Sequence, residues 1–267
     1  MTDGGKPWGL IVGSSSGFGE ATSLELAKAG LNIFGVHFDR RSAMGHVGEV
    51  VDKIKSAGSD VLFFNINAAD AAKRADALNS MQEHWRQSGG DHFVKVLLHS
   101  VAFGSLQPYL AEQAEGEVTQ AQMEMTLDVM GSNLVYWVQD LMRRKMMRSG
   151  GRIYAMTSAG GHSVIPNYGP VSAAKAVLES HVRQLAFELM PCGITVNAIQ
   201  AGVTITPGSS KIPGIEKLAE FAKMRNPAGR LTTPQDVASA IAALMDDRTH
   251  WLTGNVIRVD GGEDIVT

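Results

Sequence analysis

The stretch WGLIVGSSSGFG, residues 8–19, joins a short apolar run to a glycine-rich loop. Trp8–Val12 has the length and apolar content of a buried strand. After the loop comes an Ala/Leu/Glu/Lys pattern typical of a helix, and Gly30 ends it. A strand, a glycine turn and a helix in this order predict the first unit of an α/β fold.

The rest of the chain repeats this alternation. Six more apolar runs predict strands at residues 32–38, 61–66, 93–98, 152–156, 194–199 and 255–259, and helical patterns cover 47–57, 69–87, 120–147, 171–190 and 234–245. We therefore predict an α/β, Rossmann-type doubly wound parallel sheet of seven strands with helices on both faces, in a single domain over residues 1–267. Residues 204–230 contain turn residues and no strand, and we expect a mobile helical flap there.

Composition excludes several classes of protein. Lys plus Arg number 24 and Asp plus Glu 27, so the basic footprint of a nucleic-acid binder is missing. A single cysteine, Cys192, cannot form an intramolecular disulfide and favours a reducing, cytoplasmic location. No secretory signal or membrane span is expected, because no apolar run reaches ~18 residues. The eight histidines show no metal-ligand spacing, so we expect no metal site.

The glycine loop predicts a dinucleotide site. Its spacing is Gly-x3-Gly-x-Gly, which allows a tight turn and a close approach of the backbone to a pyrophosphate at a helix N-terminus. The serines add hydroxyl donors. The residues expected to contact the cofactor here are Gly13, Ser15, Ser16, Gly17, Phe18 and Gly19.

The end of the second predicted strand bears on which nicotinamide cofactor binds. Asp39 favours NADH, whereas Arg40 and Arg41 favour NADPH by meeting a 2′-phosphate. Asp39 lies a residue or two beyond the expected ribose-reading position, so NADPH is preferred and NADH remains open; a solvated charge cluster is the plain alternative. Asn67 and Ala68 are placed to meet the adenine edge, although Asn67 could simply form a turn.

Along essentially its whole length the chain resembles the short-chain dehydrogenase/reductase family. Besides the glycine loop, the resemblance includes Gly193–Asn197 (GITVN), Leu252–Gly254 (LTG) and Val259–Gly262 (VDGG). In that family a Ser, a Tyr and a Lys carry the chemistry, with Tyr and Lys usually four residues apart. Here Val171 stands four residues before Lys175, and the nearest tyrosine is Tyr168.

This Tyr-x6-Lys spacing is similar to that of enoyl-acyl-carrier-protein reductases. Ile165–Tyr168 (IPNY) and His99–Phe103 (HSVAF) also resemble segments of that subgroup. Met130 stands where carbonyl reductases carry the Asn of a proton relay. The chain departs from the bacterial enzymes in its glycine loop and in having Ser158 in place of a second tyrosine, which indicates a divergent type.

The resemblance implies NAD(P)H-dependent reduction of the C=C bond of a 2-enoyl thioester, as in fatty-acid elongation. Tyr168 would donate to the enolate oxygen, Lys175 would hold the nicotinamide ribose and lower the pKa of the phenol, and Ser158 would contact substrate or order its loop. Further cofactor contacts implied are Ser100, Val101, Ala102, Gly202, Val203 (to the carboxamide) and Thr206 (to the amide or a phosphate).

Alternatives remain open. The chain could be a short-chain carbonyl reductase of another substrate, or a nucleotide-binding protein without turnover. The acyl carrier could be acyl carrier protein or coenzyme A. Residues 142–148 (MRRKMMR) could be a solvated helix end or a dock for an acidic carrier protein. The family resemblance implies a homotetramer formed through residues 120–147 and 171–190.

Overall fold

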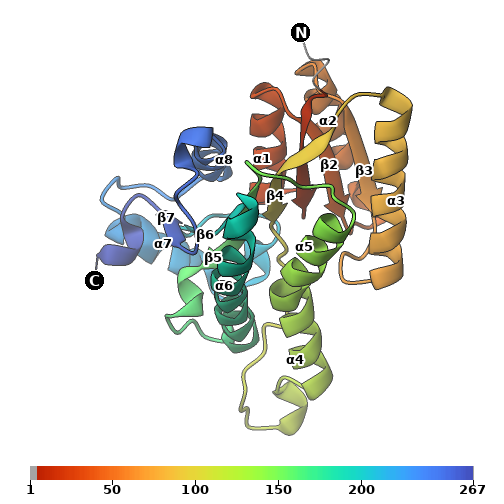
Figure 1. Cartoon of the computed structure of the whole chain (residues 1–267). Helices are drawn as coiled ribbons and strands as arrows, with labels where there is room; N and C mark the ends of the chain where they lie inside the picture. The colour runs from red at the N-terminus through yellow and green to blue at the C-terminus, as the bar shows by residue number, and fades with distance from the viewer. Residues whose placement is uncertain (1–4, 267) are drawn as a thin grey trace.

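The computed structural model describes residues 5–266. The strands are β1 (Pro7–Val12), β2 (Asn32–His37), β3 (Val61–Asn65), β4 (Phe93–His99), β5 (Arg152–Ser158), β6 (Thr195–Ala201) and β7 (Val256–Val259). They form one parallel sheet in the order β3-β2-β1-β4-β5-β6-β7 (Figure 1). All seven predicted strands and the doubly wound fold are confirmed.

Helices cover both faces of the sheet. α3 (Ala71–Ser88), α5 (Asn133–Arg143) and α6 (Gly169–Leu189) pack on one face, and α1 (Gly17–Lys28), α2 (Met44–Ser56) and α8 (Pro234–Leu244) on the other. The side chains of β1 alternate between these two cores, since Leu10 belongs to the first and Ile11 to the second. Burial on both faces explains why the strands read as continuous apolar runs.

The helix predicted over residues 120–147 contains a π turn and ends at Arg143, so the prediction was wrong in its regular α-helical geometry and in its C-terminal end. α4 (Gln120–Leu127) passes through a single π-helical turn, Asp128–Ser132, into α5. This turn packs tightly on α6: a Cβ at Gly131 would lie 3.2 Å from the Ala174 carbonyl oxygen. Such bulges change which side chains face inward, and they are frequent at functional sites.

The predicted helical insertion after the sixth strand is present. It contains a short 3₁₀ turn (Ser209–Lys211) and α7 (Ile215–Arg225), which lies beside the C-terminal segment (Figure 1). Further 3₁₀ turns are Arg41–Ala43, Ala114–Gly116, Ala159–Gly161, Met190–Cys192, Asp247–Thr249 and Glu263–Ile265. Among residues 5–266, no helix is both long and apolar enough to cross a membrane.

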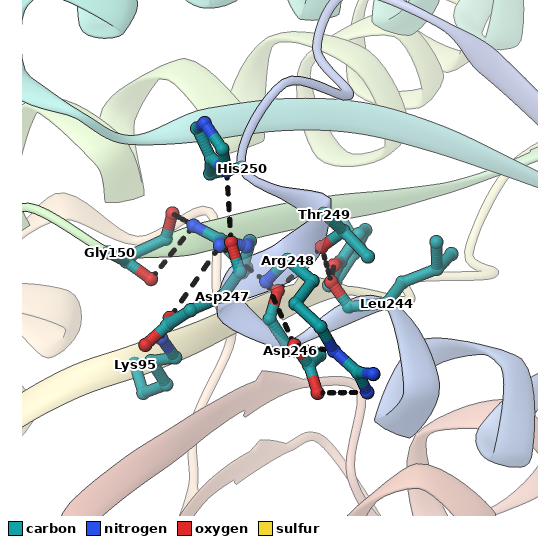
Figure 2. A network of polar contacts seen from close by, with 11 residues as sticks. Lys95, Gly150, Leu244, Asp246, Asp247, Arg248, Thr249 and His250 are labelled. Carbon is teal, nitrogen blue, oxygen red and sulfur yellow. Dashed lines mark hydrogen bonds and ion pairs between the residues drawn. The ribbon is translucent and has the colours of Figure 1, made fainter.

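Charged side chains hold the amino-terminal edge of the sheet together (Figure 2). Lys95, near the start of β4, bonds Asp247 at 2.5 Å. Arg152, the first residue of β5, is 1% exposed and donates to the carbonyls of Gly150 and Asp246 at 2.9 and 3.2 Å. These bonds attach the segment after α8 to β4 and β5 at the amino-terminal edge. The polar groups described next lie at the opposite, carboxyl-terminal edge of the sheet.

Candidate active site

The loop between β1 and α1 is folded so tightly that two positions require glycine. Gly13 has a φ of 100°, and a Cβ on Gly19 would lie 1.8 Å from the Gly13 carbonyl oxygen. This approach brings the first turn of α1 directly over the end of β1. The N-terminus of a helix reached through such a glycine turn is a site for phosphate groups.

Other predicted cofactor residues surround this loop. Ser100 donates its backbone N–H to the Val12 carbonyl at 2.7 Å, and its own carbonyl closes against Gly13. Thr206 lies against Gly17, where an added Cβ would be 3.3 Å from its Cγ2 atom. The structure therefore brings together segments that are far apart in the chain, as the family resemblance implied.

Within the loop the side chains differ in role. Ser16 occupies the N-cap position of α1 without a side-chain capping bond. The buried Ser14 hydroxyl, in contrast, donates to the Val36 carbonyl at 3.3 Å. Ser15 is half-buried, and the Phe18 side chain packs against the core under α1, which leaves its backbone to meet a phosphate. This glycine cradle at a helix N-terminus fits a dinucleotide pyrophosphate.

At the end of β2 the structure adds a histidine to the predicted cluster. His37 is buried, and its Nδ1 lies 2.9 Å from an Asp39 carboxylate oxygen. Asn65 of β3 fixes the Asp39 backbone through two hydrogen bonds of 3.0 Å. Arg40 and Arg41 are exposed. The Asp39 carboxylate is thus bound to its own strand end, whereas the two arginines extend into solvent.

The segment after β3 forms a turn. The Asn67 side chain accepts a hydrogen bond from the Ala69 N–H at 3.0 Å, which is the turn-forming alternative for this residue. The Ala68 carbonyl accepts one from the Asn133 side chain at 2.8 Å.

Tyr168 stands at the N-terminus of α6, where the preceding Asn167 adopts a left-handed φ of 62° that Asn tolerates well. The tyrosine is 8% exposed, and a Cβ on Gly160 would lie 2.6 Å from its ring. Its hydroxyl lies near the Ser158 side chain, which acts to lower the pKa of the phenol. Ser158 accepts a hydrogen bond from the Gly160 N–H at 3.1 Å. Two of the three predicted catalytic residues therefore lie close together.

The third residue, Lys175, is buried in α6 and donates to the Met156 carbonyl of β5 at 2.7 Å. Burial lowers the pKa of Lys175 to about 8, against the attraction of Glu179. Burial raises the pKa of Tyr168, with only the Ser158 side chain opposing it. The expectation that Lys175 lowers the pKa of this phenol is therefore wrong, because burial determines it.

An apolar wall stands beside the tyrosine. Tyr168 clusters with Met130, from the π turn, and with Val171 and Ala174 of α6. Leu106, Leu127, Ile165 and Ile212 pack around them, and the last of these belongs to the flap. Met130, which stands where carbonyl reductases carry the Asn of a proton relay, thus belongs to the same apolar cluster as Tyr168.

The loop after β6 is held by the C-terminal turn. The Val203 N–H donates to both carboxylate oxygens of Glu263, at 3.1 and 3.2 Å. The Val203 N–H is therefore occupied, and of the predicted backbone contact with a carboxamide only the Val203 carbonyl remains available. The adjacent Asp264 bonds Gln200 at 3.0 Å and His162 at 3.2 Å, and His162 lies in the loop between Ser158 and Tyr168.

The basic stretch 142–148 lies far from these groups. It begins in the last residues of α5 and leads to the amino ends of the strands, since the Met146 carbonyl accepts a hydrogen bond from the Val94 N–H near the start of β4. Arg148 pairs with Asp91 and stacks over Phe93, and Arg144 bonds Asn79 and Gln82. The structure therefore favours the helix-end interpretation of this stretch over the carrier-protein dock. In the described part of the chain, no three potential metal ligands cluster.

Three polar residues at this edge were not singled out from the sequence as site residues in their own right. His99 belongs to the HSVAF segment, but no pattern marks its side chain as a site group, and none marks Asn133 or Glu263. His99 Nε2 lies 3.2 Å from the Asn133 side-chain oxygen, and both residues are buried. The contact depends on the π turn, which a helical pattern does not reveal.

Fold and site together define a nicotinamide-dependent oxidoreductase of the short-chain type. The family model described as enoyl-(acyl carrier protein) reductase matches residues 12–263. The chain therefore belongs to this family of short-chain dehydrogenases/reductases.

Individual relatives have different activities. The NADH-dependent enoyl-[acyl-carrier-protein] reductase of Nostoc sp. is 28% identical over 97% of this chain and 95% of its own. A cyclohexanol dehydrogenase of Rhodococcus sp. is 27% identical over 95% and 94%. The crystal structure of the NADH-dependent enoyl-[acyl-carrier-protein] reductase of Aquifex aeolicus superposes with a TM-score of 0.83 at 24% identity, covering 99% of this chain and 98% of that one.

The Gly13–Gly19 contact yields a direct prediction. Gly19→Ala forces a methyl group into the Gly13 carbonyl and should weaken NAD(P)H binding by about tenfold or more, because strain of this kind costs roughly 1–3 kcal/mol. Nucleotide fluorescence titration measures the effect. Gly48→Ala, on α2 with open space around its Cβ, is the control. Equal affinities of the two variants would contradict a backbone cradle at this loop.

Proposed function

We propose that this protein reduces the C=C bond of a 2-enoyl thioester with NAD(P)H. The proposal rests on the positions of two side chains of α6, the phenol of Tyr168 and the ammonium of Lys175. Tyr168 lies at the helix N-terminus with its hydroxyl at Ser158, and Lys175, seven residues on, is bound to the Met156 carbonyl. Phenol and ammonium therefore occupy separate positions.

Tyr168 is suited to hydrogen bonding. Because burial raises its pKa, the phenol stays protonated around neutral pH and can donate to an oxygen on which negative charge develops. In enoyl reduction that oxygen is the thioester carbonyl, which becomes an enolate. A donor fixed there stabilises the transition state more than the ground state.

A bound nicotinamide would supply the hydride. The Gly13, Gly17 and Gly19 loop would hold its pyrophosphate, and Lys175 its nicotinamide ribose. The buried ammonium places positive charge near the developing enolate. Arg40 and Arg41 favour NADPH, whereas the Nostoc relative is named for NADH.

The apolar wall fits an acyl chain. Met130 adapts its shape readily and, together with Val171, borders the phenol without offering a competing polar group. Ile212 of the flap packs against the same cluster, so residues 204–230 would close over the chain and exclude water from the hydride path.

Carbonyl reduction is the second candidate. The proximity of Ser158 to Tyr168 favours it, because an ordinary member of the wider family pairs these two residue types. The similarity to a cyclohexanol dehydrogenase points the same way. A nucleotide-binding protein without turnover is less well supported, since Ser158, Tyr168 and Lys175 are all present.

Other parts of the proposal follow from the family. The acyl carrier is acyl carrier protein or coenzyme A, and the reaction belongs to fatty-acid elongation in the cytoplasm. A homotetramer would form through α4, α5 and α6.

The substrate test compares crotonyl-coenzyme A with acetoacetyl-coenzyme A by following NAD(P)H oxidation through the absorbance of the reduced nicotinamide. The proposal expects oxidation with the enoyl thioester and little with the ketone, because Met130 removes the polar relay position. Turnover of the ketone alone would establish the carbonyl reductase instead. Cofactor binding without turnover of either would favour the non-catalytic alternative.

Tyr168→Phe should lower kcat by roughly 100-fold, as removal of an oxyanion donor does, while the Kd for NAD(P)H changes little. Tyr154→Phe is the matched control: that buried hydroxyl donates to the Leu244 carbonyl at 2.7 Å, away from the site, and its loss should affect stability only. An unchanged kcat in the Tyr168 variant would remove this phenol from the mechanism.

Arg40→Ala should raise KM for NADPH by about tenfold and leave KM for NADH nearly unchanged, because a charge-assisted bond to the 2′-phosphate is lost. Arg86→Ala, an exposed position on α3, controls for net charge. Equal effects on the two cofactors would show that Arg40 does not recognise the phosphate.

A further inference from the structure

His99 is a buried histidine at the inner wall of the site. It is the last residue of β4 and 1% exposed. Side chains alternate along a strand, so His99 points to the same face as Leu97, which packs in the core beneath α5 and α6. Lys175 approaches from α6 on that face.

The tautomer of His99 follows from its neighbours. The Ala68 carbonyl can only accept, so the amide nitrogen of Asn133, 2.8 Å away, faces it. The amide oxygen of Asn133 is then directed at His99 Nε2, at 3.2 Å. Because that oxygen can only accept, Nε2 carries the ring proton and Nδ1 presents a lone pair.

This lone pair has no partner. Nδ1 of His99 is fully buried and forms no hydrogen bond with any described residue. Burial, with the positive charge of Lys175, lowers the pKa of His99 to about 3, so the ring stays neutral at physiological pH. A permanently neutral acceptor thus lies within the field of a buried ammonium.

Lys175 has hydrogen-bond donors that find no acceptor among the described residues. Within residues 5–266, its ammonium makes one hydrogen bond, to the Met156 carbonyl, and two N–H groups remain. Met156 follows Ala155, the residue that pairs with His99 in the β4–β5 register. An acceptor without a donor and a donor with unused protons therefore lie at the ends of neighbouring strands.

We propose that His99 is a positioning residue for Lys175: its Nδ1 accepts a hydrogen bond from the ammonium, directly or through one buried water. The bond keeps the amine charged and oriented towards the nicotinamide ribose. Asn133 fixes the tautomer that makes this possible. The proposal rests on the nicotinamide site of the proposed function, but not on the identity of the substrate.

Two groups act on the charge of Lys175 in this arrangement. His99 approaches from β4, and Glu179 lies one turn further along α6, where it accepts from Thr157 at 2.6 Å and raises the pKa of the lysine. Glu179 is unaltered by changes at His99. A shift in the titration of Lys175 in a His99 variant therefore reports on the ring.

Two substitutions separate the ring nitrogens. His99→Gln retains a donor near the Nε2 position but removes the Nδ1 acceptor. His99→Asn places an amide oxygen near Nδ1 and gives up the bond to Asn133. A merely structural role would make the two variants similar, or the Asn variant worse. His181→Gln, on α6 six residues from Lys175, is the matched control.

The readout is the Kd for NADPH, measured by nucleotide fluorescence on the full chain between pH 6 and 10. The wild type and His181→Gln should lose affinity as Lys175 deprotonates, with a midpoint above 8, because the pKa of about 8 reflects burial and Glu179 alone, without the bond to His99. In His99→Gln the midpoint should fall by roughly one pH unit, because the charged form loses an acceptor. In His99→Asn it should stay close to the wild type.

An unchanged midpoint in His99→Gln, or equal shifts in both variants, would overturn the proposal. Nitrogen-15 NMR of the wild type and of Lys175→Met tests it without relying on His99 variants or on cofactor binding. The expected spectrum shows the Nε2–H tautomer, with an Nδ1 resonance that moves when Lys175 is replaced. An Nδ1–H tautomer, or an Nδ1 resonance indifferent to Lys175, would refute it. Absence of enoyl turnover would affect only the proposed reaction.

Discussion

The close approach of Gly19 to the Gly13 carbonyl is the constraint on which the site depends. It leaves no room for a Cβ, and it sets the first turn of α1 over the end of β1. Ser100 closes on Gly13 from the next strand, and Thr206 on Gly17 from the flap. Since all strands run parallel, their carboxyl ends meet at this edge, and a single backbone contact aligns the segments that would hold a dinucleotide.

The sequence predicted the fold well because the five inner strands of the sheet are buried on both faces. Such strands read as apolar runs whatever their neighbours, and the ends of all seven shift by two residues at most. The family resemblance also named residues of several loops as cofactor contacts, and the structure places two of them, Gly17 and Thr206, against each other. The helix over 120–147 was predicted as continuous, since a π turn leaves no trace in the apolar pattern. The contacts of Met130 with the Tyr168 cluster and of Asn133 with His99 could therefore not be predicted from the spacing of apolar residues.

Electrostatics at the site were the least predictable part. The family resemblance implied that Lys175 would act on the phenol of Tyr168, yet burial dominates both groups and moves their pKa values in opposite directions. The phenol becomes a weaker acid and the ammonium a stronger one. Both groups are protonated, as their roles require, only while the pH stays below the pKa of Lys175, about 8, because the phenol keeps its proton to higher pH. The charge of the lysine therefore sets the upper pH limit of the site.

The C-terminal turn, residues 260–263, links this site to the flap, residues 204–230. No local sequence pattern predicts this link. Glu263 takes the Val203 N–H just before the flap begins, and Asn226, just after α7, donates to the Asp260 carbonyl at 2.8 Å. Both ends of the segment that carries Ile212 are therefore bound to the same short turn. Burial raises the pKa of Glu263. The carboxyl group can accept the hydrogen bond from the Val203 N–H whether it is charged or neutral, so this anchor does not depend on its protonation state. With both ends held, rearrangement of the flap is confined to the residues between these anchors, which include the one that packs against the cluster of Tyr168.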